Sequence, residues 1–123
     1  MNILLVDDSK PMRNLQKHAL GALGDVTFSE ACDGMDAMRV IAASPNGFSL
    51  ILIDWNMPNM DGLELITHIR ETDKKTPLIM VSTEGEDEQV ARAALAGVTG
   101  YITKPFTTDG LVEKVKATLA KAA

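Results

Sequence analysis

Short, uninterrupted apolar runs alternate with segments of helical periodicity along this chain. The runs occupy residues 3–6, 50–53 and 78–81 and contain only Ile, Leu, Val and Met. Such runs are typical of strands that are buried on both faces of a parallel sheet, because helices cover each side. Residues 26–31 indicate a shorter second strand, and residues 101–103 indicate the last one.

Between the runs, apolar residues recur at the spacing of one helix face, which predicts five helices. The predicted faces are Met12, Leu15, Ala19 and Leu23; Ala37, Met38, Ile41 and Ala42; Leu63, Ile66 and Ile69; Val90, Ala91, Ala94 and Leu95; and Leu111, Val112, Val115 and Leu119. The order of elements is therefore (βα)5. Right-handed crossovers make the strands parallel, so the ends of strands one, three, four and five open on one sheet edge, where open α/β sheets bind ligands.

Length and composition predict a single domain over residues 1–123, since 46% of the residues are hydrophobic and no repeat or linker is visible. The start at Met1 argues against a missing N-terminal domain, whereas the end at residues 120–123 leaves a missing C-terminal domain open. No apolar run reaches membrane length, so a cytoplasmic protein with no membrane contact is expected.

Charge and cysteine content narrow the partners further. The formal net charge of −5 disfavours nucleic-acid binding through a basic face and favours a protein partner. The one cysteine, Cys32, excludes an internal disulfide and is expected to be a small, partly buried hydrophobe in a reducing compartment.

Three carboxylates follow predicted strands. Asp7 and Asp8 end the first run, Asp54 ends the run at 50–53, and Lys104 follows the last strand. Taken singly, Asp8 or Ser9 could cap a helix, Asp54 could be a turn residue and Lys104 a solvated charge. Together, three carboxylates at one edge repel one another unless some are protonated or a cation is bound. An all-oxygen acidic site suits Mg²⁺, which readily shares its coordination with a phosphate.

Other groups complete a cradle for a phosphoryl group. Lys104 supplies a second positive charge, and the hydroxyls of Ser82 and Thr83 and the loop amides after Asp54 supply hydrogen-bond donors. No nearby histidine or cysteine replaces the carboxylate as nucleophile, so Asp54 itself would attack phosphorus and form an aspartyl phosphate. Trp55 follows Asp54 directly; it could be only an exposed aromatic, yet its place makes it a natural reporter of metal binding.

A set of motifs in fixed order and spacing gives the chain a family resemblance. The motifs are Leu5–Ser9, Ile53–Pro58, Asp61–Gly62, Val81–Thr83 and Lys104–Phe106. From residue 2 to about 120 the chain resembles the receiver domains of two-component response regulators, and it is most similar to the stand-alone chemotaxis regulators of that family. The resemblance implies a flavodoxin-like α/β fold, with a five-stranded parallel sheet of order 2-1-3-4-5 and helices on both faces.

The resemblance also implies a magnesium site. Asp54 would be the phosphoacceptor. Asp8, Asp54 and the backbone carbonyl of Asn56 would bind Mg²⁺ directly, and Asp7 would contribute through water.

Further roles are implied for the strands that follow. Ser82, Thr83, Lys104 and Asn56 would bind the phosphoryl group, with Lys104 pairing with it and Ser82 donating a hydrogen bond. Tyr101 would be the switch aromatic that moves between outward and inward rotamers. The bond between Lys104 and the proline that follows it would be cis.

The implied protein is a monomeric phosphoacceptor switch that assists its own phosphorylation and dephosphorylation, and not an enzyme. Its donor would be a phosphohistidine on a sensor kinase of the chemotaxis type, and its target a protein such as a flagellar motor switch component. The acidic stretch Glu84–Glu88 departs from the usual family pattern on the face that meets partners.

Two alternatives stay open. A receiver cut from a longer regulator would have the same sequence features and a separate output domain. A dehalogenase-like phosphatase would also use an aspartyl nucleophile, Mg²⁺ and a lysine, but that family places an Asp-x-Asp pair after its first strand. Here Asp7 and Asp8 are adjacent, the candidate nucleophile ends the third strand, and 123 residues leave no room for a cap domain.

Overall fold

The computed structural model describes residues 1–122, in which strands and helices alternate. The strands are β1 (Asn2–Val6), β2 (Thr27–Ala31), β3 (Leu50–Asp54), β4 (Leu78–Ser82) and β5 (Gly100–Thr103). The helices are α1 (Lys10–Leu20), α2 (Gly34–Ala42), α3 (Gly62–Thr72), α4 (Asp87–Ala96) and α5 (Thr108–Ala122), and a short 3₁₀-helix, η1 (Gly21–Leu23), follows α1. None of these helices is long and apolar enough to cross a membrane.

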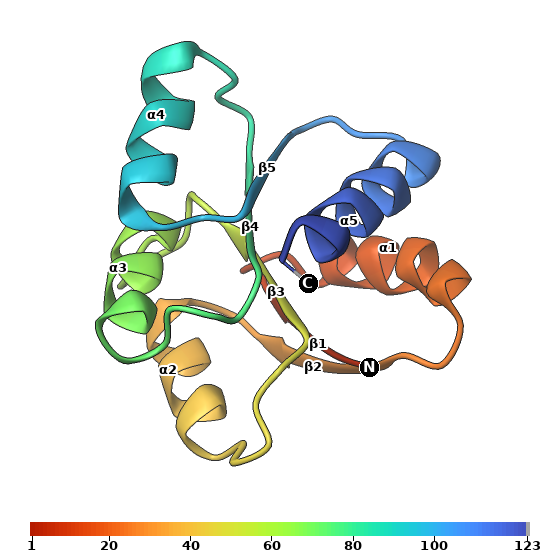
Figure 1. The fold of residues 1–123 in the computed structure, drawn as a ribbon, viewed down its shortest axis with the longest axis horizontal. Helices are drawn as coiled ribbons and strands as arrows, with labels where there is room; N and C mark the ends of the chain where they lie inside the picture. The colour runs from red at the N-terminus through yellow and green to blue at the C-terminus, as the bar shows by residue number, and fades with distance from the viewer. Residues whose placement is uncertain (123) are drawn as a thin grey trace.

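All strand pairs are parallel, and the strand order is β2-β1-β3-β4-β5, which confirms the predicted topology. α1 and α5 cover one face of the sheet, while α2, α3 and α4 cover the other (Figure 1). The register pairs Val6 with Ile53, Asp54 with Val81, and Ser82 with Thr103. The carboxyl ends of the four strands β1, β3, β4 and β5 therefore meet at one edge.

Alternate residues of the central strands enter two separate apolar clusters. Leu4, Val6, Ile51 and Ile53 face the cluster under α2, α3 and α4. Ile3, Leu5, Leu50 and Leu52 face the cluster under α1 and α5. This double burial explains why the sequence runs are apolar at every position rather than at every second one.

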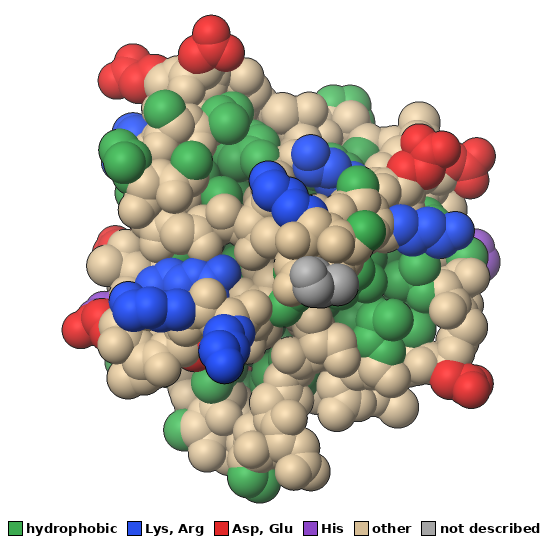
Figure 2. All heavy atoms as spheres, viewed as in Figure 1, with side chains coloured by type: hydrophobic (Ala, Val, Ile, Leu, Met, Phe, Trp, Pro, Cys, Tyr) green, Lys and Arg blue, Asp and Glu red, His purple; other side chains and the backbone are tan. Residues whose placement is uncertain are grey.

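One predicted helix face was wrong in rotation, and another was wrong at a single residue. In α1, Leu15 is 44% exposed, whereas Gln16 is buried. In α4, Leu95 is 90% exposed and Ala93 is buried, so apolar side chains lie on the outer surface of α4 (Figure 2). The buried face of α1 contains a polar residue, so apolar spacing misplaced Leu15, although Ala19 is buried as predicted. α4 is rich in alanine on all sides, so apolar spacing gives the wrong rotation there.

Two single-residue expectations also need correction. Cys32 is exposed because it lies beyond the end of β2, where its amide donates to Asp36 Oδ2 at 3.0 Å. Trp55 is buried, with 8% of its surface exposed. Its amide extends the β3–β4 pairing by donating to the Val81 carbonyl at 3.0 Å. The Trp55 side chain lies in the apolar cluster under α2, α3 and α4.

Candidate functional site

The predicted acidic residues lie together at the carboxyl edge of the sheet. Asp7 follows β1, Asp54 ends β3, and Asp8 begins the loop to α1. One carboxylate oxygen from each lies within 4.8 Å of the others. Asp7 and Asp54 are only 1% and 6% exposed, while Asp8 is open to solvent. The three strand-end carboxylates therefore form one cluster that is accessible from the side of Asp8.

Lys104 reaches this cluster from the end of β5. Its Nζ lies 3.1 Å from Asp54 Oδ1 and 3.6 Å from Asp7 Oδ2. Its amide donates to the Ser82 carbonyl at 2.7 Å, which anchors the lysine backbone beside β4. The Lys104–Pro105 bond is cis, as the resemblance implied. One ammonium group thus faces two buried carboxylates.

The surroundings of the cluster disfavour the charged forms of Asp7 and Asp54. Burial raises the pKa of Asp54, and the charge of Asp7 raises it further, against the opposing effect of Lys104. Burial also raises the pKa of Asp7, although the Ser9 amide and Lys104 oppose the shift. A single ammonium therefore does not compensate the buried negative charge.

The donor set fits Mg²⁺. Asp7 Oδ1 accepts a hydrogen bond from the Ser9 amide at 2.8 Å, but Asp7 Oδ2 is buried and has no hydrogen-bond donor. A buried carboxylate oxygen without a donor calls for a cation, and carboxylate oxygens are the ligands that Mg²⁺ prefers. Asn56, whose carbonyl was expected to join this set, lies exposed in the loop after β3.

Ser82 and Tyr101 are linked through one residue of the loop after β4. Ser82 is buried at the strand end, and its Oγ accepts a hydrogen bond from the Glu84 amide at 3.0 Å. The Tyr101 hydroxyl donates to the Glu84 carbonyl. Thr83, which lies between Ser82 and Glu84 in the sequence, is exposed.

An aromatic pair connects this region to the loop after β3. The half-buried Tyr101 ring meets the Trp55 ring edge-on, with centroids 6.5 Å apart and an interplanar angle of 72°. Arg92 of α4 lies over the Trp55 ring, with its guanidinium carbon 5.5 Å from the ring centroid. Movement of Tyr101 would therefore change the surroundings of Trp55.

Sequence reasoning missed the packing demand on Gly62. A Cβ at this position would lie 2.4 Å from the Asp54 carbonyl oxygen and 2.9 Å from Trp55 Cα. The Gly62 amide donates to the Trp55 carbonyl at 2.8 Å. The glycine that closes the loop after β3 thus allows α3 to begin directly against the backbone of Asp54. Its position one residue after the helix cap Asp61 is the signal in the sequence.

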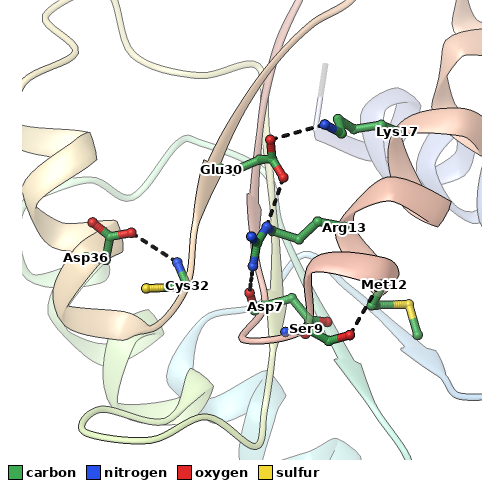
Figure 3. A network of polar contacts seen from close by, with 8 residues as sticks. All are labelled: Asp7, Ser9, Met12, Arg13, Lys17, Glu30, Cys32 and Asp36. Carbon is green, nitrogen blue, oxygen red and sulfur yellow. Dashed lines mark hydrogen bonds and ion pairs between the residues drawn. The ribbon is translucent and has the colours of Figure 1, made fainter.

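Arg13 was also missed, because six residues separate it from the aspartate that it contacts. Its guanidinium donates to the backbone carbonyl of Asp7 at 2.5 Å and to Glu30 Oε1 at 2.9 Å (Figure 3). The first turn of α1 therefore contacts the backbone of one member of the acidic cluster. Only the pairing of β1 with β2, which places Glu30 next to this helix, brings the three residues together.

Comparison with known proteins agrees with this geometry. Residues 3–116 match the response regulator receiver domain. The chain is 42% identical over 117 residues to the chemotaxis protein CheY-3 of Vibrio cholerae, covering 94% of this chain and 88% of that protein. It is 40% identical over 118 residues to the chemotaxis protein CheY of Pseudomonas aeruginosa, covering 94% of each. The structure of the Francisella response regulator 1452 receiver domain superposes with a TM-score of 0.87 at 30% identity, covering 99% of this chain and 98% of that one.

Proposed function

Because the chain belongs to the family of response regulator receiver domains, we propose that it is a switch controlled by phosphorylation of Asp54. Receiver domains of this kind are signalling switches rather than classical enzymes. One observation carries the proposal: a nearly buried carboxylate at a strand end faces a lysine ammonium at 3.1 Å, inside a cluster with two further aspartates.

The chemistry is transfer of a phosphoryl group from a kinase histidine. An Asp54 carboxylate oxygen attacks phosphorus as the bond from phosphorus to the histidine nitrogen breaks, and an acyl phosphate forms. Lys104 would exchange its ion pair with Asp54 for one with the phosphoryl oxygens. Ser82 at the end of β4, Thr83 directly after it, and Asn56 after β3 would donate the remaining hydrogen bonds.

Mg²⁺ is the proposed cofactor. Asp8, Asp54 and the Asn56 carbonyl would bind it directly, and Asp7 through water. When bound, the ion neutralises charge on the carboxylates and on the phosphoryl group. The buried Asp7 Oδ2 without a donor supports this assignment.

The proposed partners follow from the relatives, which are chemotaxis proteins. The donor would be a sensor histidine kinase of the chemotaxis type, and the target a protein such as a flagellar motor switch component, with the chain acting as a cytoplasmic monomer. The net charge of −5 opposes binding to nucleic acid.

The test is labelling by a small acyl phosphate in the presence of Mg²⁺. Wild-type protein should acquire one acid-stable, base-labile phosphate, and Asp54→Asn should acquire almost none. Asp61→Asn is the matched control, because Asp61 caps α3 with its side chain and lies outside the acidic cluster. Full labelling of Asp54→Asn at the wild-type rate would contradict the proposal.

A further inference from the structure

Arg13 joins two elements behind the acidic cluster. From the end of the first turn of α1 its Nε donates to Glu30 Oε1 of β2 at 2.9 Å, and its Nη1 donates to the Asp7 carbonyl at 2.5 Å (Figure 3). The Arg13 side chain is only 13% exposed, so both bonds are largely shielded from water. The planar guanidinium can make both bonds at once, which a single ammonium cannot do in the same geometry.

With the Arg13 bond included, every polar atom of Asp7 except Oδ2 has a hydrogen-bond partner. Its amide donates to the Ala31 carbonyl at 3.1 Å, and its Oδ1 accepts from the Ser9 amide at 2.8 Å. Its carbonyl accepts from Arg13. Only Oδ2, on the side of Lys104 and the other carboxylates, has no hydrogen-bond donor. The direction of that oxygen therefore depends on the bonds that fix the rest of the residue.

Glu30 in turn holds the arginine. The hydrogen bond from Arg13 is the main cause that lowers the pKa of Glu30, so the carboxylate is charged at neutral pH. Lys17, one turn further along α1, bonds the other oxygen of Glu30 at 3.1 Å. Within the described residues, the Lys17 ammonium bonds Glu30 and does not contact Asp7, so the two cations share one partner and differ in their reach to the cluster.

We propose that Arg13 is a positioning residue that makes the acidic cluster selective for Mg²⁺ over Ca²⁺. This inference rests on the magnesium site proposed above. Mg²⁺ demands near-ideal octahedral geometry, whereas Ca²⁺ accepts six to eight oxygens in flexible arrangements. Loosening Asp7 should therefore weaken Mg²⁺ binding more than Ca²⁺ binding. A purely electrostatic role predicts the opposite, since removing a cation near the cluster would strengthen the binding of both ions.

The experiment measures the affinities of Mg²⁺ and Ca²⁺ by isothermal titration calorimetry, with Trp55 fluorescence as a second readout. Arg13→Lys keeps the positive charge but loses the planar guanidinium that bonds Glu30 and Asp7 at once, and Arg13→Met loses both the charge and these bonds. Lys17→Met is the matched control, because it removes the other partner of Glu30. For Arg13→Lys we expect the Mg²⁺ affinity to fall about tenfold, the usual effect of removing a group that orients a metal ligand. Ca²⁺ affinity should change little, and Lys17→Met should resemble wild type for both ions.

Other results would overturn the inference in distinct ways. An equal loss for both ions, or stronger binding of both, would assign Arg13 a structural or an electrostatic role. The same loss of Mg²⁺ selectivity in Lys17→Met would show that Glu30 pairing, rather than contact with Asp7, is responsible. If wild-type protein bound no Mg²⁺, the proposed metal site would fall with the inference, whereas wild-type affinity in folded Arg13→Lys would overturn the inference alone.

Discussion

At the scale of single residues, Asp54 is the proposed phosphoacceptor, and its ionised form lowers the stability of the fold. Its pKa is raised by burial and by the charge of Asp7, so the folded state binds a proton more tightly than the unfolded chain does. Stability attributable to this group therefore falls as the pH rises from the unfolded value of 3.8 through the raised native pKa. Above that range, the ionised Asp54 destabilises the fold in the absence of a metal.

Asp54→Asn should accordingly raise the thermal midpoint at pH 7 without Mg²⁺. The expected gain is several degrees, since about 1 kcal/mol corresponds to roughly 4 °C for a domain of this size. The gain should shrink as the pH falls toward 4, because wild-type Asp54 then becomes protonated. Melting curves at several pH values measure this difference. A gain that does not depend on pH would contradict the assigned cause.

Gly62 is a second residue whose identity is dictated by its surroundings. Gly62→Ala forces a Cβ against the backbone of Asp54 and Trp55, so we expect a loss of about 1–3 kcal/mol in the free energy of unfolding. Gly21→Ala is the control: nothing lies within 4 Å of its Cβ position, and its φ of −58° suits alanine. Urea denaturation should show Gly21→Ala at or above wild-type stability. Equal effects of the two substitutions would refute the steric argument.

At the scale of elements, we propose that Ser82 at the end of β4 and Tyr101 within β5 respond to phosphorylation together. The Glu84 amide donates to Ser82 Oγ, and the Glu84 carbonyl accepts from Tyr101. If Ser82 turns toward a phosphoryl group on Asp54, the Glu84 amide loses its acceptor. A modification shifts such an equilibrium only through different contacts in the two states, and this hydrogen bond would be one of those contacts.

Hydrogen exchange of the Glu84 amide should report that movement. In wild-type protein the amide should exchange faster after phosphorylation. In Ser82→Ala it should exchange fast in both states, although Asp54 is still phosphorylated. Tyr101→Phe loses only the bond to the Glu84 carbonyl, so it should keep the phosphorylation-dependent increase. Unchanged exchange in phosphorylated wild type would mean that Ser82 does not leave Glu84.

The elements also show how far the sequence alone leads. The strands and the convergence of Asp7, Asp54 and Lys104 could be predicted, because apolar runs and the parallel topology determine them. The strand order followed from the resemblance to receiver domains. The rotation of α4 could not, because alanine on several sides gives Leu95 the appearance of a core residue. The contact from Arg13 to the Asp7 carbonyl depends on tertiary packing of α1 on β2 and has no short-range signal.

At the scale of the whole molecule, the acidic cluster links metal binding to folding. Its carboxylates converge from separate segments, β1 with its following loop and β3, and they meet only when the sheet is formed. The unfolded chain therefore lacks the site, and an ion that binds only the folded state stabilises it by RT ln(1 + [L]/Kd). At a Mg²⁺ concentration 100-fold above Kd this amounts to about 2.7 kcal/mol.

Saturating Mg²⁺ should thus raise the thermal midpoint of wild-type protein by roughly 10 °C at about 4 °C per kcal/mol. Asp8→Ala should melt near the wild-type midpoint without metal, because Asp8 is exposed, yet it should lose most of the rise with Mg²⁺. NaCl at matched ionic strength controls for general screening, which acts on exposed charges throughout the molecule. If Asp8→Ala kept the full rise, or if NaCl reproduced it, the stabilisation would come from surface charge and not from an ion held at the end of the sheet.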